Sequence, residues 1–221
     1  MEDPIPKENH DLFSPFPYPL GKKISFPIPS NKRSKDFLEV ILSRRSERVF
    51  EKGITIESIV DLLYFANKIE SCALDQNDFL ITRRTAPSGG GRHPIDILVS
   101  MPDDMDKRQF DLYNPIDHSI TRLLLPQEDR KNFFKKLSVN LDHTNACIFW
   151  FTIQKDKTDS KYHNPESLFW RDAGALMYCV HLISHYLELK SCPVGTLASQ
   201  EFSNLFGSPK ILSGGGIYVG K

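Results

Sequence analysis

The segment from about Ser167 to Leu189 constrains the fold more than any other part of the sequence, because its apolar residues recur at helical spacing. One stripe along this helix comprises Phe169, Ala173, Leu176, Met177, Val180, Ile183 and Leu187, and further apolar surface comes from Leu168, Ala175, Leu182 and Tyr186. A helix with so much apolar surface must be covered by protein on most sides. We therefore expect it at the centre of a domain or across a subunit interface.

Three shorter helices are predicted from the same kind of spacing. The first runs from Ser34, as its N-cap, to about Ser43, and its expected apolar face is Phe37, Leu38, Ile41 and Leu42. The second begins at Thr55 and presents Ile59, Leu62, Leu63, Ala66 and Ile69. The third covers about 127–137.

Strands are expected at 95–101, around 110–113, at 146–153 and at 217–219, and the polar stretch 71–78 is expected to be a loop. The strand at 146–153 is a run of β-forming residues without alternation, which is typical of a strand covered on both faces.

The first 33 residues form a separate region, which we expect to be an extended arm preceding a single domain at 34–221. This region contains Pro4, Pro6, Pro15, Pro17, Pro19, Pro27 and Pro29, interspersed with Phe13, Phe16, Tyr18 and Phe26. Proline fixes φ and lacks a donor, so the region cannot be a helix. Its aromatic side chains favour an arm that lies along the folded body or along a partner subunit. A proline-rich recognition ligand is the alternative.

Composition excludes several classes of function. Lys plus Arg total 28 and Asp plus Glu total 28, so no overall field draws the protein to nucleic acid or to an anionic membrane. No apolar run is long enough to span a bilayer, and the N-terminus lacks the pattern of a signal peptide. The four cysteines are far apart, which argues against a zinc site and a disulfide framework. We expect a soluble cytoplasmic protein.

The turn at 83–94, Arg-Arg-Thr-Ala-Pro-Ser-Gly-Gly-Gly-Arg-His-Pro, is the most informative local motif. Consecutive glycines allow positive φ and leave no Cβ in the way, so a flat or anionic ligand can approach the main chain. A tight turn between two elements is the alternative for a glycine triplet taken alone. A lone histidine, His93, is interpreted as a packing residue.

The segment Ser43-Arg44-Arg45-Ser46-Glu47-Arg48 is the second motif. Three guanidinium groups and a hydroxyl at the end of a helix can converge on a phosphate, because the planar fork of arginine suits a dianion. Basic residues are also common at helix C-termini, where they complement the dipole. Neither a G-x-G-x-x-G turn after a strand nor a Walker A motif is present.

Three further segments carry candidate residues. Tyr113-Asn114-Pro115-Ile116-Asp117-His118 contains a turn initiator, and we interpret Asp117 and His118 as structural because neighbouring strand positions face opposite sides. Lys161-Tyr162 lies in a polar loop ahead of the long helix, where a surface role is the simplest interpretation. Cys192-Pro193-Val194-Gly195-Thr196 follows that helix, and Gly220-Lys221 ends the chain.

In their order and spacing from about Asp36 to Lys221, these segments resemble the FMN-dependent nitroreductase-like superfamily and, within it, the SagB-type oxidases that convert peptide azolines to azoles. The resemblance departs at Gly91-Arg92-His93, where many relatives carry an aliphatic residue and a tyrosine. It implies a nitroreductase-like α+β fold, with a mixed or antiparallel central sheet flanked by helices, in an interdigitated homodimer with two FMN sites at the interface.

The resemblance also implies roles for individual residues. Lys161 and Tyr162 correspond to the proposed catalytic dyad, with Lys161 as the base and Tyr162 orienting or relaying the proton. The implied FMN contacts are Arg44, Arg45, Ser46, Arg48, Arg84, Pro87, Ser88, Gly89, Val194, Gly195 and Lys221.

The implied reaction is the FMN-dependent oxidation of thiazolines or oxazolines to thiazoles or oxazoles in a ribosomally made precursor peptide. Dioxygen is the expected final acceptor, and a cyclodehydratase that makes the azoline is the expected partner. Three alternatives stay open: an NAD(P)H-dependent reductase of nitroaromatics, quinones or flavin; a non-catalytic scaffold subunit of an azole synthetase complex; and oxidation of another heterocycle.

Overall fold

The computed structural model describes residues 2–30, 35–75, 78–139 and 141–221. In chain order its elements are β1 (Ile5–Pro6), β2 (Leu20–Ser25), α1 (Phe37–Ser43), α2 (Ile56–Asn67), β3 (Ile69–Leu74), β4 (Leu80–Arg84), the short 3-10 turn η1 (Gly89–Gly91), β5 (Ile95–Ser100), β6 (Asp111–Asn114), β7 (Ser119–Leu123), α3 (Gln127–Ser138), β8 (Cys147–Gln154), α4 (Lys155–Asp159), β9 (Tyr162–His163), α5 (Glu166–Tyr186), β10 (Lys190–Val194), α6 (Ser199–Phe206) and β11 (Ile211–Gly220).

The main sheet has seven strands in the order β10-β11-β8-β5-β6-β7-β2, and every neighbouring pair is antiparallel. Of the two arrangements expected, mixed or antiparallel, the antiparallel one is correct. Strand β8 lies inside the sheet and all eight of its residues are buried, as its unbroken run of β-forming residues predicts.

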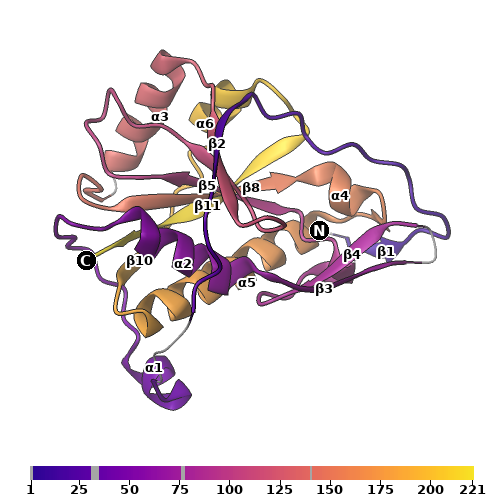
Figure 1. Cartoon of the computed structure of the whole chain (residues 1–221). Helices are drawn as coiled ribbons and strands as arrows, with labels where there is room; N and C mark the ends of the chain where they lie inside the picture. Colours follow the sequence, from indigo (N-terminus) through magenta and orange to yellow (C-terminus); the bar gives the residue numbers. More distant parts are fainter. Residues whose placement is uncertain (1, 31–34, 76–77, 140) are drawn as a thin grey trace.

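Helices cover both faces of this sheet (Figure 1). On one face α2 and α5 pack over a core that includes Phe149 and Phe151 of β8. On the other face α3 and α6 cover Ile148 and Trp150. Alternate residues of β8 therefore enter opposite cores, which is the consequence of the two-residue period of a strand.

Helix α5 confirms the long helix expected from the apolar spacing, but its cover is one-sided within this chain. Leu176 and Val180 are buried against the sheet and α2. Trp170 and Tyr178, on another side, are 39% and 51% exposed. The predicted apolar residues are buried or half-buried, and these two aromatic side chains outside the predicted set face away from the body.

Helix α1 differs from its prediction in two ways. It begins at Phe37 with Asp36 as N-cap, whose carboxylate accepts from the backbone N–H groups of Leu38 and Glu39, while the expected cap Ser34 lies outside the described residues. The four residues of its expected apolar face are all exposed, and only Val40 is buried. The helix projects from the body (Figure 1), and the described part of the chain leaves that face uncovered.

Residues 71–74, expected to be part of a loop, belong instead to the hairpin of β3 and β4. Most of β3 is exposed, so its sequence shows no alternation of buried apolar and exposed polar residues. Helix α2 begins after Thr55 as predicted, with the Thr55 hydroxyl accepting from the N–H of Ser58. It ends at Asn67, however, and Ile69, which was predicted on its apolar face, begins β3.

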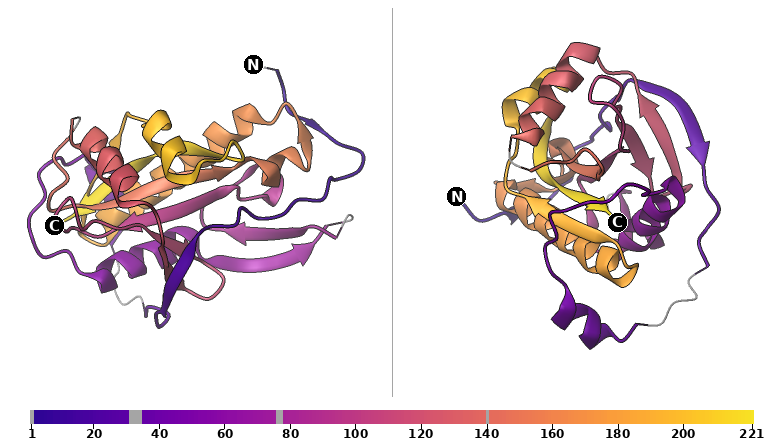
Figure 2. Two further views of the ribbon diagram at one scale, coloured as in Figure 1. Left: turned by 90° about the horizontal axis from the view of Figure 1, so that it is seen from above. Right: turned by 90° about the vertical axis from the view of Figure 1, so that its left-hand side faces the viewer.

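The N-terminal arm is extended and runs along the outside of the body (Figure 2). Its strand β1 pairs with β9, and β2 pairs with β7 at the edge of the main sheet. The ring of Phe13 lies 5.1 Å from that of Phe79, and Phe16 contacts Phe206. The aromatic side chains of the arm therefore pack on the body of the same chain. The predicted boundary between residues 33 and 34 falls outside the described residues.

Two observations concern membrane-spanning helices and disulfide bonds. Among the described helices, none has both the length and the apolar composition needed to cross a bilayer. All four cysteines are free thiols, with Cys147 buried and Cys72 exposed.

Candidate functional site

The glycine turn is held in place by a carboxylate of α5. The hydroxyl of Ser88 donates to Asp172 at 2.5 Å, and the backbone N–H of Gly89 donates to the same carboxylate at 3.0 Å. The backbone N–H of His93 then donates to the Ser88 hydroxyl at 2.8 Å. Burial raises the pKa of Asp172, and the two bonds from the turn act in the opposite direction. These bonds lock the turn onto the first half of α5.

The turn packs directly against Lys161 and Tyr162. A Cβ added to Gly90 would lie 2.5 Å from the Tyr162 hydroxyl and 3.0 Å from Lys161 Nζ, and Gly90 has a φ of 62°. Only glycine satisfies both conditions at this position. Lys161 Nζ itself lies 5.7 Å from the centre of the Tyr162 ring. The structure thus brings together two segments that are about 70 residues apart.

The arm supports the segment that carries this pair. Pro6 of β1 faces Tyr162 of β9, and the backbone N–H of Lys7 donates to the carbonyl of Lys161 at 2.8 Å. Further along the arm, the N–H of Asp11 donates to the carbonyl of Ser160, also at 2.8 Å. The backbone around the pair is therefore fixed by residues at the start of the chain.

A second contact of the arm lies beside the glycine turn. His10 of the arm is 3.1 Å from the carboxylate of Asp75 and 2.8 Å from the guanidinium of Arg92. That guanidinium is buried and stacks 3.2 Å above the centre of the Phe79 ring. Burial and the charge of Arg92 lower the pKa of His10. The arm is thus fixed to both sides of the turn.

The arginine segment lies at the other end of α5. Arg44 is half-buried, with its guanidinium 2.7 Å from His181 Nε2 on the second half of α5. The backbone N–H of Glu47 donates to the carbonyl of Ser191, which attaches the segment to β10. Ser46 is half-buried and Arg48 is exposed. The R-x-S-x-R motif therefore forms a strip beside the edge strand of the sheet.

Arg45 behaves differently from its neighbours. Its guanidinium donates to the carbonyls of Leu42 and Arg44, at 2.9 and 2.8 Å. This is the helix C-terminus role that the sequence left open for a basic residue in this segment.

The remaining predicted contacts at this end lie close to the arginine segment in the fold. The backbone N–H of Glu51 donates to the carbonyl of Lys221 at 2.7 Å, so the chain terminus lies beside the segment. Val194 ends β10, and Gly195 follows it. No described atom lies within 4 Å of the point where a Cβ of Gly195 would be, so its main chain is open.

His181 is a buried residue of this end that the sequence analysis did not identify. Its Nδ1 lies 2.7 Å from the Ser191 hydroxyl, and its other nitrogen faces Arg44. Burial and the charge of Arg44 lower its pKa to about 4. The sequence does contain a signal for both His181 and Asp172, because each is a polar residue among the apolar positions of the long helix.

The two groups of predicted residues do not meet within one chain. Asp172 and His181, which mark the two ends, are nine residues apart on α5, or about 14 Å along the helix axis at its usual rise. Ser88, Gly89 and the Lys161–Tyr162 pair belong to one end. The arginine segment, Gly195 and Lys221 belong to the other.

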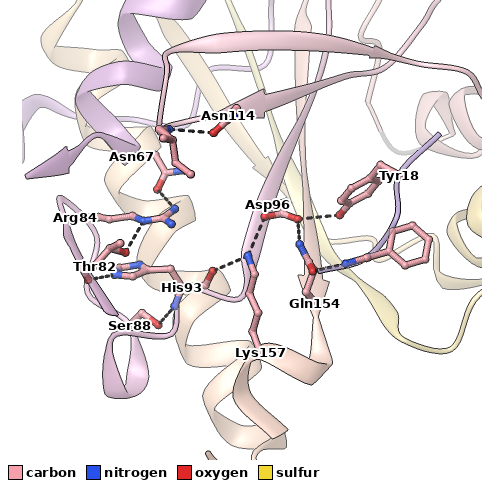
Figure 3. Close-up of polar contacts among 12 residues, drawn as sticks. Tyr18, Asn67, Thr82, Arg84, Ser88, His93, Asp96, Asn114, Gln154 and Lys157 are labelled. Atoms are coloured by element: carbon pink, nitrogen blue, oxygen red, sulfur yellow. Dashed lines mark hydrogen bonds and ion pairs between the residues drawn. The ribbon is translucent and has the colours of Figure 1, made fainter. Parts of the chain in front are cut away.

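Arg84 lies between Thr82 and Asn67 (Figure 3). Its guanidinium donates to the side chains of Thr82 at 3.1 Å and Asn67 at 3.2 Å, on the wall of a cavity between the arm and the sheet. Pro87 is exposed beside a small pocket at the base of the turn.

The histidines of the turns have structural contacts. His93 Nε2 lies 2.8 Å from the carbonyl of Thr82, and burial lowers its pKa to about 4. Asp117 pairs with Lys23, whereas His118 contacts the hydroxyl of Tyr113. Asp117 and His118 lie in a turn rather than on a strand, and they do not form a pair with each other, as the structural interpretation expected.

Comparison with known proteins gives one family. The sequence model described as the nitroreductase family matches residues 41–221. No curated protein matches the sequence.

Several solved structures share the fold. A protein of Ralstonia eutropha JMP134 assigned as a nitroreductase is 16% identical, with a TM-score of 0.68 over 100% of this chain and 98% of the other. The E. coli microcin synthetase McbBCD complex, with truncated pro-MccB17 bound, contains a chain that is 16% identical, with a TM-score of 0.61 over 97% of this chain and 79% of that one. A Desulfovibrio desulfuricans protein assigned as a nitroreductase, in complex with FMN, is 16% identical, with a TM-score of 0.54 over 85% and 87% of the two chains.

Proposed function

Since this chain belongs to the nitroreductase family of flavin-dependent oxidoreductases, we propose that it uses FMN to oxidise peptide thiazolines or oxazolines to thiazoles or oxazoles in the synthesis of a ribosomal peptide product. The observation that carries the proposal is the packing of Lys161 and Tyr162 against Gly90, because an amine and a phenol held at a main-chain surface are suited to removing a proton from a flat ring. The microcin synthetase complex among the structures with this fold supports the same assignment.

The arginine end has a donor set that fits the phosphate of FMN. Arg44 and Arg48 supply guanidinium groups, and the chain terminus brings Lys221 to the same region. A dianion beside Arg44 would offset the positive charge that now lowers the pKa of His181. The open main chain at Gly195 leaves room for a flat ring system to lie against it.

A second copy of the chain completes this site. The two ends lie on opposite halves of α5, so two α5 helices packed antiparallel would place the glycine turn of one subunit near the arginine segment of the other. Trp170, Gly174 and Tyr178 follow one another at four-residue intervals on the exposed side of α5, which is the spacing of a helix-packing face. The exposed apolar side of α1 adds to the surface that a partner would cover.

The chemistry required of the chain is limited to positioning and proton transfer. Conversion of an azoline to an azole removes one hydride and one proton and leaves an aromatic ring. FMN, when bound, supplies the hydride acceptor, with dioxygen as the final acceptor. Lys161 Nζ accepts the proton, and the Tyr162 hydroxyl orients the Lys161 amine. Asp172 holds the glycine turn, and the arm holds the backbone of the pair.

The expected partners follow from the substrate. An azoline in a peptide is made by cyclodehydration of a cysteine, serine or threonine side chain onto the preceding carbonyl. A cyclodehydratase must therefore act first, and a complex with it would pass the ring on directly.

Mass spectrometry of a cyclised peptide treated with the flavin-loaded protein tests the proposal. The expected product has lost two hydrogen atoms per ring. Lys161→Ala should abolish this loss while flavin stays bound, and Lys107→Ala, an exposed lysine paired with Asp104, serves as the matched control. An unchanged peptide together with rapid oxidation of NADPH would show that the protein is a reductase instead.

A further inference from the structure

Of the residues implied to contact flavin, only Arg84 lines the cavity between the N-terminal arm and the sheet. Two adjoining compartments, of about 480 and 410 Å³, have four lining residues in common: Pro15, Arg84, Ile116 and Lys157. Each lies within the range of about 300 to 1,000 Å³ that small-molecule sites occupy. We propose that this cavity binds a ligand with a carboxylate and an apolar body, and that the carboxylate pairs with Arg84.

The guanidinium of Arg84 carries the proposal. Its residue is half-buried, and burial lowers the pKa of the guanidinium. Its two hydrogen bonds go to the neutral oxygens of Thr82 and Asn67, and none of the ion pairs in the described residues includes it. A partly desolvated cation held only by neutral groups is less stable than one with a counter-ion, and a carboxylate placed against its remaining N–H groups would stabilise it.

The carboxylate nearest in this cluster, that of Asp96, is engaged elsewhere (Figure 3). Its oxygens accept from the Tyr18 hydroxyl at 3.0 Å and from the side chain of Gln154, and Lys157 Nζ lies 3.4 Å away. These contacts tie Asp96 to the arm and to α4. In the larger compartment, Arg84 and Lys157 therefore face one carboxylate that is already committed.

The rest of the lining suits an apolar body. The lining of the larger compartment includes Phe16 and Pro17 of the arm together with Leu112 and Ile116. The geometry of arginine favours a planar carboxylate that can bind in a bidentate manner. An inorganic anion alone would leave these apolar walls facing water.

The proposal reassigns Arg84, which was expected to contact flavin. It does not depend on the reaction that the flavin carries out, because the cavity lies on the arm side of β4. The ligand is either a small hydrophobic acid or the free C-terminus of a peptide, since both present the same group.

Calorimetry on the full-length, flavin-loaded protein tests the proposal with two probes. Phenylacetate represents the small acid, and a pentapeptide ending in phenylalanine represents the chain terminus, each compared with its uncharged amide. At least one acid should bind more tightly than its amide, and the tighter of the two identifies the source. Equal binding of acids and amides, or no binding by any probe, would overturn the proposal.

Two variants link the binding to Arg84. Arg84→Gln should weaken binding of the acid about tenfold or more, the usual worth of a charge-assisted bond, and leave the amide unaffected. Arg83→Gln changes the adjacent arginine, whose side chain is 79% exposed, and should have no effect on either probe. Loss of flavin in Arg84→Gln would place Arg84 in the flavin site and contradict the proposal.

A third variant keeps the test valid if Arg84→Gln fails to fold. Ile116 is 76% exposed at the mouth of the cavity, so Ile116→Trp should be tolerated and should narrow the opening. Weaker binding of the acid in this variant supports the cavity as the site. Unchanged binding would show that the probe binds elsewhere.

Discussion

The two ends of α5 differ in how completely the protein satisfies its own polar groups. At the first half, Asp172 accepts from Ser88 and Gly89, and the arm fixes the backbone next to Lys161. At the second half, Arg44 faces a neutral histidine, and its charge lowers the pKa of that histidine. At the first end the groups that position the glycine turn and Lys161 are paired within the chain, whereas the second end holds excess positive charge.

This difference suggests a division of labour. Groups that transfer a proton must already be in place before substrate arrives, so rigid support by the protein is useful there. Groups that bind a phosphate gain from lacking an internal counter-ion, because the ligand then supplies it. Four predictions test this contrast.

The largest effect, on turnover, is expected at the end of α5 that carries Lys161 and Tyr162. Gly90→Ala would force a Cβ to within 2.5 Å of the Tyr162 hydroxyl, so the pair must move. Misplacement by about 1 Å can cost about a hundredfold in rate, and we expect a loss of that order in turnover of the azoline peptide with flavin still bound. Gly207→Ala is the matched control, because Gly207 has a φ of 58° but no described atom within 4 Å of the added Cβ. Equal losses in both variants would mean that backbone strain alone is responsible.

The second effect concerns the end with excess charge. Arg44→Gln should weaken FMN binding about tenfold or more, measured by fluorescence titration of the flavin-free protein, because a charge-assisted bond to phosphate is lost. Arg45→Gln should change the affinity little, since the guanidinium of Arg45 is committed to the end of α1. If Arg45→Gln proves the more damaging change, the assignment of the phosphate site is wrong.

The third prediction joins the two ends through a partner. Gly174→Gln adds a side chain where no described atom of the same chain lies within 4 Å of the Cβ, so the subunit should fold normally. The dissociation constant of the dimer, measured by sedimentation, should increase about tenfold because the added side chain overfills a helix–helix contact. Asn204→Gln on the exposed side of α6 is the control. An unchanged dimer would exclude this face of α5 from the interface.

The smallest effect is a dependence of stability on pH. The pKa of His181 is about 4 in the folded protein and 6.5 in the reference state, so the unfolded chain binds more protons between these values. Stability should therefore fall as the pH falls from 6.5, by about 1 kcal/mol at about pH 5.5 from this residue alone. Denaturant titrations at the two pH values measure this change, and His181→Gln should reduce it. If the free energy of unfolding of His181→Gln falls by the same amount between the two pH values, other groups cause the change.

The sequence predicts the parts of the fold that build the core. Helices α2 and α5 and strand β8 were found where apolar spacing or an unbroken β-forming run placed them. The hairpin of β3 and β4 was missed because it is largely exposed, so no burial pattern marks it. The exposed apolar side of α1 was expected to be buried because periodicity cannot tell which chain provides the cover.

The candidate site was predicted segment by segment rather than as a whole. The sequence singled out Lys161 and the glycine turn separately, and the fold places them in contact. Asp172 and His181 were not identified, since each looks like an interruption of an apolar stripe until its partner is known. Arg84 was predicted from its motif, but the direction of its side chain depends on Asn67, which belongs to another element.

The decisive experiment is anaerobic mixing of the flavin-loaded protein with an azoline peptide. We expect the peptide to remove the visible absorbance of the flavin, one azole to form for each flavin reduced, and Gly90→Ala to slow this step. Absorbance that persists with the peptide but disappears with NADPH would contradict this expectation.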